Sequence, residues 1–130
     1  MSSLNKPYEI SVWEDRWDST QSKFVEYRLG IIGTHLMTSQ NRAFDPNLSR
    51  NVNGTRTFSF KMYKRYKDSI TGEEVINPFI NLLTNERKVK LKYGTYIDQN
   101  GQTRERWYDF VIKDVNENSS TYLHTYQLED

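Results

Sequence analysis

The chain has 130 residues, a formal net charge of +1 and no cysteine, which fits one domain over residues 1–130 and excludes disulfides and thiolate metal sites. The balance of 18 basic and 17 acidic side chains argues against a protein held to nucleic acid or to an anionic membrane by bulk charge. Only 35% of the residues are hydrophobic, so aromatic side chains must supply much of the core.

The first predicted elements form a β-hairpin. Residues 8–13 alternate well enough for a strand, residues 14–22 give a polar connection, and residues 23–32 alternate again as the second strand. Gly30 and Gly33 near its end are compatible with a bulge or a sharp bend. Such a bend is the device by which a sheet curls into a barrel.

A long polar segment separates this hairpin from the next strand. Residues 38–54 are rich in Ser, Asn, Asp, Gly and Pro and show no period, which predicts a long loop. Loops of this length are often functional or become ordered on a partner. Residues 55–66 then alternate strictly, with Phe58, Phe60 and Met62 expected inward.

The second half predicts a short helix and three further strands. Asn77 followed by Pro78 is typical of a helix start, and the helix is expected over residues 78–85. A period of two follows at Val89, Leu91 and Tyr93, with lysines between them, and the Asn-Gly pair at residues 100–101 predicts a tight hairpin into a strand over 104–115. The last strand covers 121–128. We therefore expect a mainly β fold, a small antiparallel barrel or sandwich of about six strands with one short helix.

The sequence shows no compact catalytic cluster. It has no glycine-rich phosphate loop, nucleophile elbow or paired metal motif. His35 and His124 lie far apart without a carboxylate at metal-ligand spacing, and a partly buried or interfacial role is the simpler interpretation of His124. We expect no enzymatic activity, no metal and no cofactor.

Two features suggest binding surfaces. A run of basic and aromatic residues resembles single-strand nucleic-acid barrels, with Lys61, Tyr63, Lys64 and Arg65 as binding residues, together with Phe58 and Phe60. Simple alternation, with Phe inward and Lys in water, is the favoured interpretation of the same run. Trp17 stands in a charged connection without an obvious core position, and an exposed tryptophan often marks a binding surface; packing over a barrel end is the competing explanation.

The order of elements resembles the opening domain of phage tail hub and tail-tip proteins, including endopeptidase-like tails. The resemblance covers most of the chain and lies in a Gly-x-x-Thr-Phe-Ser-Phe-like strand, an Asn-Glu-x-x-Val-x-Leu strand and a Tyr-x-Phe-x-Ile return. The matching residues are Gly54, Phe58, Phe60, Asn85, Glu86, Val89, Leu91, Tyr108, Phe110 and Ile112.

The resemblance implies a virion structural protein that is made in the host cytoplasm and incorporated into the tail. Its implied partners are further copies of itself in a ring around the tail channel, and neighbouring tail tube, distal tail or baseplate proteins. It implies no catalysis in this segment, no membrane, and nucleic acid only under the alternative interpretation. The interface residues we expect are Trp17 and four residues of the 38–54 loop: Arg42, Phe44, Asp45 and Leu48.

Overall fold

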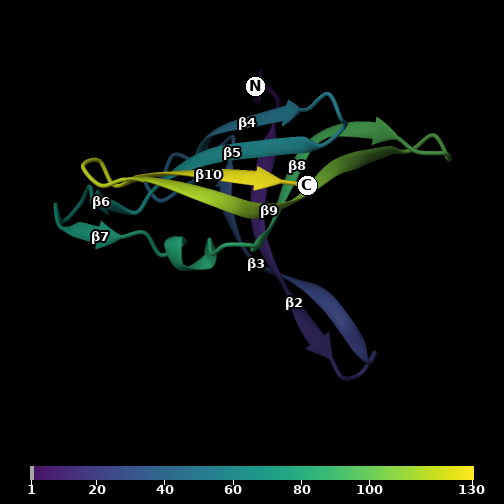
Figure 1. Ribbon diagram of the computed structural model, residues 1–130, viewed down its shortest axis with the longest axis horizontal. Coiled ribbons are helices and arrows are strands. Elements are labelled where there is room, and N and C mark those ends of the chain that lie inside the picture. The colour runs from purple at the N-terminus through teal and green to yellow at the C-terminus, as the bar shows by residue number, and fades with distance from the viewer. Residues whose placement is uncertain (1) are drawn as a thin grey trace.

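The computed structural model describes residues 2–130, and within them the fold is mainly β. Eight strands form one curled antiparallel sheet in the order β1-β4-β5-β10-β9-β8-β2-β3, and β6 and β7 form a separate two-stranded ribbon (Figure 1). The sheet makes a half-barrel, which confirms the predicted fold class. The strands are β1 (Ser2–Ser3), β2 (Tyr8–Asp18), β3 (Lys23–Thr34), β4 (Phe44–Arg50), β5 (Arg56–Tyr63), β6 (Arg65–Lys67), β7 (Glu74–Ile76), β8 (Lys88–Ile97), β9 (Thr103–Asn118) and β10 (Leu123–Glu129).

The core fills the concave side of this sheet. The alternation predicted for the central strands is confirmed, because Phe58, Phe60 and Met62 of β5 are buried. The half-barrel is drawn together at one corner, where the Ala43 N–H donates to the Ile32 carbonyl oxygen at 2.8 Å. The other buried hydrophobic residues are Ile10, Val12, Ile32, Ala43, Leu83, Val89, Leu91, Phe110, Ile112, Tyr126 and Leu128.

Strand β3 carries the bulges that its glycines suggested. Its pairing with β2 shifts register twice, so that Ile32 and Leu29 have no partner in the ladder. An unpaired bulge residue re-aims its side chain. Ile32 is accordingly buried completely, and Leu29 packs against the core from a partly buried position.

The predicted helix and the predicted long loop both differ from the structure. The helix expected over 78–85 is a single 3-10 turn, η1 (Ile80–Leu82). Asn77 does begin a turn, because its side-chain oxygen accepts the Phe79 N–H at 2.9 Å. Leu83, however, has left the helical conformation. So short a segment has too few hydrogen bonds to repay helix nucleation. The loop expected over 38–54 contains strand β4, whose alternation is hidden by an irregularity between Phe44 and Asn47.

The hairpin of β2 and β3 extends far beyond the sheet. Pairing of β2 with β8 ends at Trp13, whereas pairing with β3 continues to Asp18 opposite Lys23. The part of the predicted connection from Glu14 to Asp18 is therefore strand. We call residues 14–28 the arm; it projects from the body as a two-stranded ribbon (Figure 1).

Candidate functional site

The end of the arm exposes two large apolar side chains. Trp17 and Phe24 lie opposite each other in the ladder, their rings meet edge to face with centroids 5.3 Å apart, and they are 59% and 66% exposed. The turn between them is ordered by Asp18, which accepts the N–H groups of Thr20 at 2.9 Å and Gln21 at 3.3 Å. The arm thus presents an ordered apolar tip to solvent, and Trp17 is exposed rather than packed over a barrel end.

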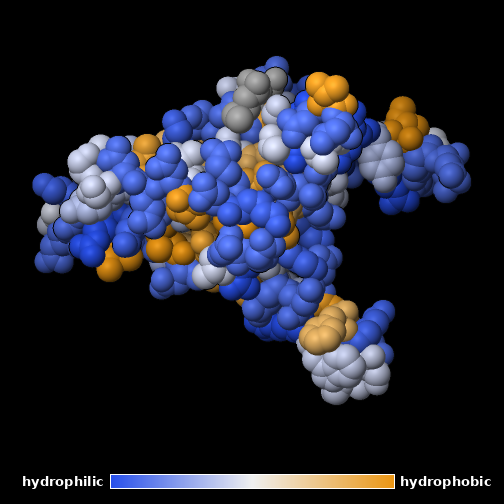
Figure 2. Space-filling view, viewed as in Figure 1, coloured by the Kyte–Doolittle hydropathy of each residue, from blue (hydrophilic) through white to orange (hydrophobic). Residues whose placement is uncertain are grey.

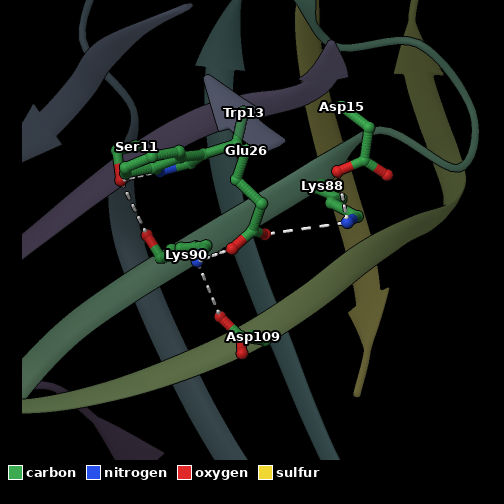
Figure 3. Close-up of polar contacts among 7 residues, drawn as sticks. All are labelled: Ser11, Trp13, Asp15, Glu26, Lys88, Lys90 and Asp109. Carbon is green, nitrogen blue, oxygen red and sulfur yellow. Dashed lines mark hydrogen bonds and ion pairs between the residues drawn. The ribbon is translucent and has the colours of Figure 1, made fainter. Parts of the chain in front are cut away.

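Ion pairs fix the root of the arm to the sheet (Figure 3). Lys88 Nζ lies 2.8 Å from Asp15 of β2, and Lys90 Nζ lies 2.8 Å from Glu26 of β3 and 3.7 Å from Asp109 of β9. The hydrogen bond from Lys90 is the largest cause lowering the pKa of the Glu26 carboxyl. These lysines are therefore matched by carboxylates of the same chain, which leaves them poorly placed to attract an external polyanion.

Lys90 is held by a further contact, because its ammonium also lies 4.8 Å from the centroid of the Trp13 ring. The indole N–H of Trp13 donates to Ser11 Oγ at 2.8 Å, which fixes the ring over β8. A cation over an indole face is attracted by the ring quadrupole. The arm therefore leaves the sheet from a well-ordered base.

The structure brings together most of the other predicted site residues. Phe44 of β4 stacks on Tyr63 of β5 with centroids 5.4 Å apart, and the guanidinium of Arg42 lies 5.5 Å from the Phe44 ring. Lys61 Nζ lies 3.1 Å from Asp45. Residues predicted for a protein interface (Arg42, Phe44 and Asp45) and residues predicted to bind nucleic acid (Lys61 and Tyr63) therefore share one surface. We call this surface, together with Lys64 and Arg65, the β4–β5 patch.

The β4–β5 patch retains free positive charge at one end. Arg65 lies 5.8 Å from the ring of Tyr122, and neither Lys64 nor Arg65 has an acidic partner among residues 2–130. Phe58 and Phe60 are core residues and contribute no ring to this surface. Of the remaining predicted interface residues, Leu48 packs against the core and Trp17 belongs to the separate arm.

A recess of about 740 Å³ opens at the other end of β2 from the arm tip. Its rim carries Lys6 and Arg106, neither of which has an acidic partner among the described residues. Burial raises the pKa of the Tyr8 hydroxyl on its wall. The larger apolar and aromatic side chains lining the recess are Pro7, Tyr8, Leu36, Tyr93 and Tyr108.

The two histidines are engaged in ordinary structural contacts. The Tyr8 N–H donates to His35 Nδ1 at 3.1 Å. His124 is buried beside the Tyr126 hydroxyl, with 3.3 Å from Nδ1 to the oxygen, and burial lowers its pKa. Within residues 2–130 there is no group of three or more His, Asp or Glu side chains that could hold a metal ion, and no helix long and apolar enough to cross a membrane.

Sequence reasoning placed Trp17 on a surface but missed its partner Phe24 and the recess. Phe24 could have been found by continuing the hairpin ladder through the charged segment, because the register sets it across from Trp17. The recess has no comparable signal, since its walls come from β2, β3, β8 and β9 and from the segments before β2 and after β3. Comparison of the chain with protein-family profiles, curated sequences and solved structures found no match.

Proposed function

We propose that this chain is a structural module of a phage virion, a tail hub or baseplate component that assembles around the tail channel through protein–protein contacts. The observation that carries the assembly function is the arm, with the exposed rings of Trp17 and Phe24 at its tip. Exposing apolar rings at the end of an ordered ribbon costs free energy in an isolated chain, and contact with another protein recovers it. The tail setting rests on the resemblance in the order of elements.

Other projecting ends of the molecule share this character. The β8–β9 hairpin carries Tyr96 and Ile97, and the β6–β7 ribbon carries Ile70 in its turn and Ile76 at the end of β7, all of them exposed. Figure 2 shows apolar side chains, in orange, at the ends of the body and of its projections. Several projecting contacts suit a subunit that must touch more than one neighbour. The proposal requires no catalytic group and no cofactor.

The test is the particle mass from light scattering over a concentration series, with electron microscopy of the same samples. The measurement is made on the chain alone and with tail tube, distal tail and baseplate proteins encoded beside it. A ring, or incorporation into a tail-like particle, is the expected result. A chain that remains monomeric in every mixture would overturn the proposal.

A second candidate function is binding of single-stranded nucleic acid at the β4–β5 patch. The observation favouring it is the Phe44–Tyr63 stack beside Lys64 and Arg65, whose charges have no acidic partner among residues 2–130. Bases stack on such rings, and free cations bind the phosphates. Lys61 is less available, because Asp45 neutralises it.

This candidate is tested by titrating a fluorescent oligonucleotide at two salt concentrations. Binding should weaken as salt rises, and Lys64→Glu with Arg65→Glu should weaken it further. The matched control is Lys113→Glu, a change at an exposed lysine that lies on β9, apart from the patch, and pairs with Glu86. Equal binding by both variants, or no binding by the wild type at low salt, would remove nucleic acid as a ligand of the patch.

A further inference from the structure

Strand β2 joins two complementary surfaces that cannot meet within one chain. Tyr8, at its start, lies on the wall of the recess, and Trp17, near its end, lies at the arm tip. Nine residue steps along a strand span about 30 Å. Figure 1 shows the arm leaving the body on the side away from the start of β2. Each chain thus carries one apolar projection and one apolar hollow, at opposite ends of the same strand.

We propose that the arm tip of one copy docks into the recess of a second copy, so that copies associate head to tail. This inference rests on the proposed assembly function and names the partner and the contact. A head-to-tail contact is heterologous, and it generates a ring if the rotation between copies closes and a filament if it does not.

The recess has the volume and the apolar lining of a binding site, and the arm tip is apolar. The recess, about 740 Å³, lies within the range of cavities of about 300–1,000 Å³ that bury most of a bound group. Trp17 and Phe24 are large rings already ordered against each other, so docking them costs little side-chain entropy. Tyr8, Tyr93 and Tyr108 line the recess, and aromatic groups pair favourably with one another.

Charged groups at the tip and at the rim can set the orientation of the docked arm. Asp18, next to Trp17, accepts amide hydrogen bonds from the turn and from Gln21 but has no basic partner among residues 2–130. Lys6 and Arg106 at the rim of the recess have no acidic partner in the same part of the chain. The tip also carries Lys23, which lies opposite Asp18 in the ladder and has no acidic partner among residues 2–130, and the recess also carries Glu9 and Glu105, both paired with Lys92. The docked orientation we expect is therefore the one in which Asp18, and not Lys23, faces Lys6 and Arg106. Opposite charges at the rim of an interface steer association and fix its register.

The first test uses two variants with exposed substitutions, followed by light scattering. Trp17→Ala with Phe24→Ala removes the tip, and Leu36→Glu places a charge at the recess; Leu36 is 77% exposed, so folding should persist. Each variant should raise the midpoint concentration for self-association about thirtyfold or more, as expected for a hot spot. Val52→Ala, at a fully exposed residue outside both surfaces, is the control and should leave the midpoint unchanged. Circular dichroism checks the fold of all three.

Mixing the two defective variants distinguishes head-to-tail docking from pairing of two arms. The mixture retains one intact contact, between the tip of the Leu36→Glu chain and the recess of the arm variant, so it should form dimers and nothing larger. An arm-to-arm contact would instead leave Leu36→Glu fully able to assemble. A mixture that stays monomeric although the wild type associates would overturn the inference.

Cross-linking supplies an independent readout, because the natural chain has no cysteine. Ser19→Cys in the arm turn and Thr95→Cys on the recess are mixed under mild oxidation, and Ser19→Cys with Ser119→Cys, in the β9–β10 turn, is the matched control. The first pair should give at least about tenfold more mixed disulfide than the control, in line with a specific contact. Equal yields would overturn the docking.

The outcomes separate this inference from the proposed function. Association of the wild type that neither the arm variant nor Leu36→Glu disturbs would overturn only the docking. A wild type that never associates with itself but enters tail-like particles would also overturn only the docking. A chain monomeric in every mixture would overturn both.

Discussion

Gly33 and Ala43 lie so close together that the first has no room for a side chain. A Cβ atom built on Gly33 would lie 2.7 Å from the Ala43 carbonyl oxygen and 3.0 Å from the Ala43 Cβ. This contact is at the corner where the Ala43 N–H bonds to Ile32 and draws the half-barrel together. The end of β3 and the start of β4 can meet only because residue 33 is glycine.

Gly33→Ala should therefore destabilise the fold by about 1–3 kcal/mol, because the added methyl forces backbone apart in a packed corner. The measurement is urea unfolding followed by circular dichroism. Gly30→Ala is the matched control, since nothing lies within 4 Å of its added Cβ, and it should be neutral or slightly stabilising. Equal effects of the two substitutions would show that the corner relaxes freely.

Asn77 should contribute strongly to the stability of the fold through the hydrogen bonds of its side chain. Its buried amide group donates to the carbonyl oxygens of Asn41 at 3.0 Å and Tyr63 at 2.9 Å, and its oxygen accepts the Phe79 N–H. Asn77→Ala removes the partner of three backbone groups, so at about 1 kcal/mol or more for each group we expect a loss of at least about 3 kcal/mol in the free energy of unfolding.

The control for Asn77 is Asn116→Ala, at an exposed position of β9, which should change stability by less than about 0.5 kcal/mol. Both variants are compared in urea unfolding at neutral pH. A small effect of Asn77→Ala would mean that water reaches the orphaned carbonyl groups.

These contacts show where sequence reasoning succeeds and where it stops. Strand β5 was predictable because one of its faces is buried and its register with β10 is unbroken, so Phe58 and Phe60 keep a strict period of two. Strand β4 was not, because the irregularity after Phe44 hides its alternation. Asn77 was predicted to start a helix and starts a single 3-10 turn instead, and its bonds to Asn41 and Tyr63 depend on tertiary packing.

The same limit applies to the candidate surfaces. The exposure of Trp17 follows from its lack of a core position in the local pattern, whereas the edge contact with Phe24 requires the full hairpin register. The stack of Phe44 on Tyr63 requires β4 to pair with β5, a pairing that a loop over 38–54 excludes. Local periodicity predicts which side chains are exposed to solvent. It does not predict which of the exposed side chains contact one another.

His124 should make stability depend on pH just below neutrality. Burial lowers its folded-state pKa, an effect that nearby Lys64 reinforces and Glu117, 3.9 Å away, partly offsets. The unfolded chain therefore binds a proton first, and stability is lost as pH falls from about 6.5 toward the lower folded value. The slope is at most about 1.4 kcal/mol per pH unit.

The measurement for His124 is the free energy of unfolding between about pH 7.5 and pH 5.5, above the range in which carboxyl groups such as Glu26 titrate. His124→Gln should remove this part of the pH dependence whatever its effect on stability at pH 7.5. An unchanged slope in that variant would place the titrating group elsewhere.

Lys90 should matter more than an ordinary surface lysine. Its side chain is only 18% exposed and bridges Glu26 of the arm to Asp109 of β9. Lys90→Met keeps the aliphatic stem but removes the ion pairs and the cation over Trp13, and we expect a loss of about 1 kcal/mol, more than for an exposed pair.

The control is Lys113→Met, which breaks the more exposed pair with Glu86 and should cost less than about 0.5 kcal/mol. The two variants are compared by the midpoint of their thermal unfolding at low and high salt. High salt should reduce the difference in midpoint between the wild type and Lys90→Met only in part, because the ion pair between Lys90 and Glu26 is half-buried. Equal losses would mean that the root of the arm is as mobile as the surface.

Phe60 and Tyr63 lie three residues apart on β5 but should respond differently to truncation. Phe60 is fully buried and stacks on Tyr126, so Phe60→Ala should destabilise the fold by about 3–5 kcal/mol. Tyr63 is 37% exposed and stacks on Phe44, so Tyr63→Ala should cost only about 1 kcal/mol.

If the β4–β5 patch binds a partner, Tyr63→Ala should weaken binding while the chain stays folded, whereas any loss caused by Phe60→Ala should track the unfolded fraction. Denaturant unfolding and binding are therefore measured on the same preparations. A Phe60→Ala variant that is stable but fails to bind would place that ring on the functional surface. The burial of Phe60 among the core side chains argues against that outcome, and it makes Tyr63 the residue at which binding by the patch should be tested.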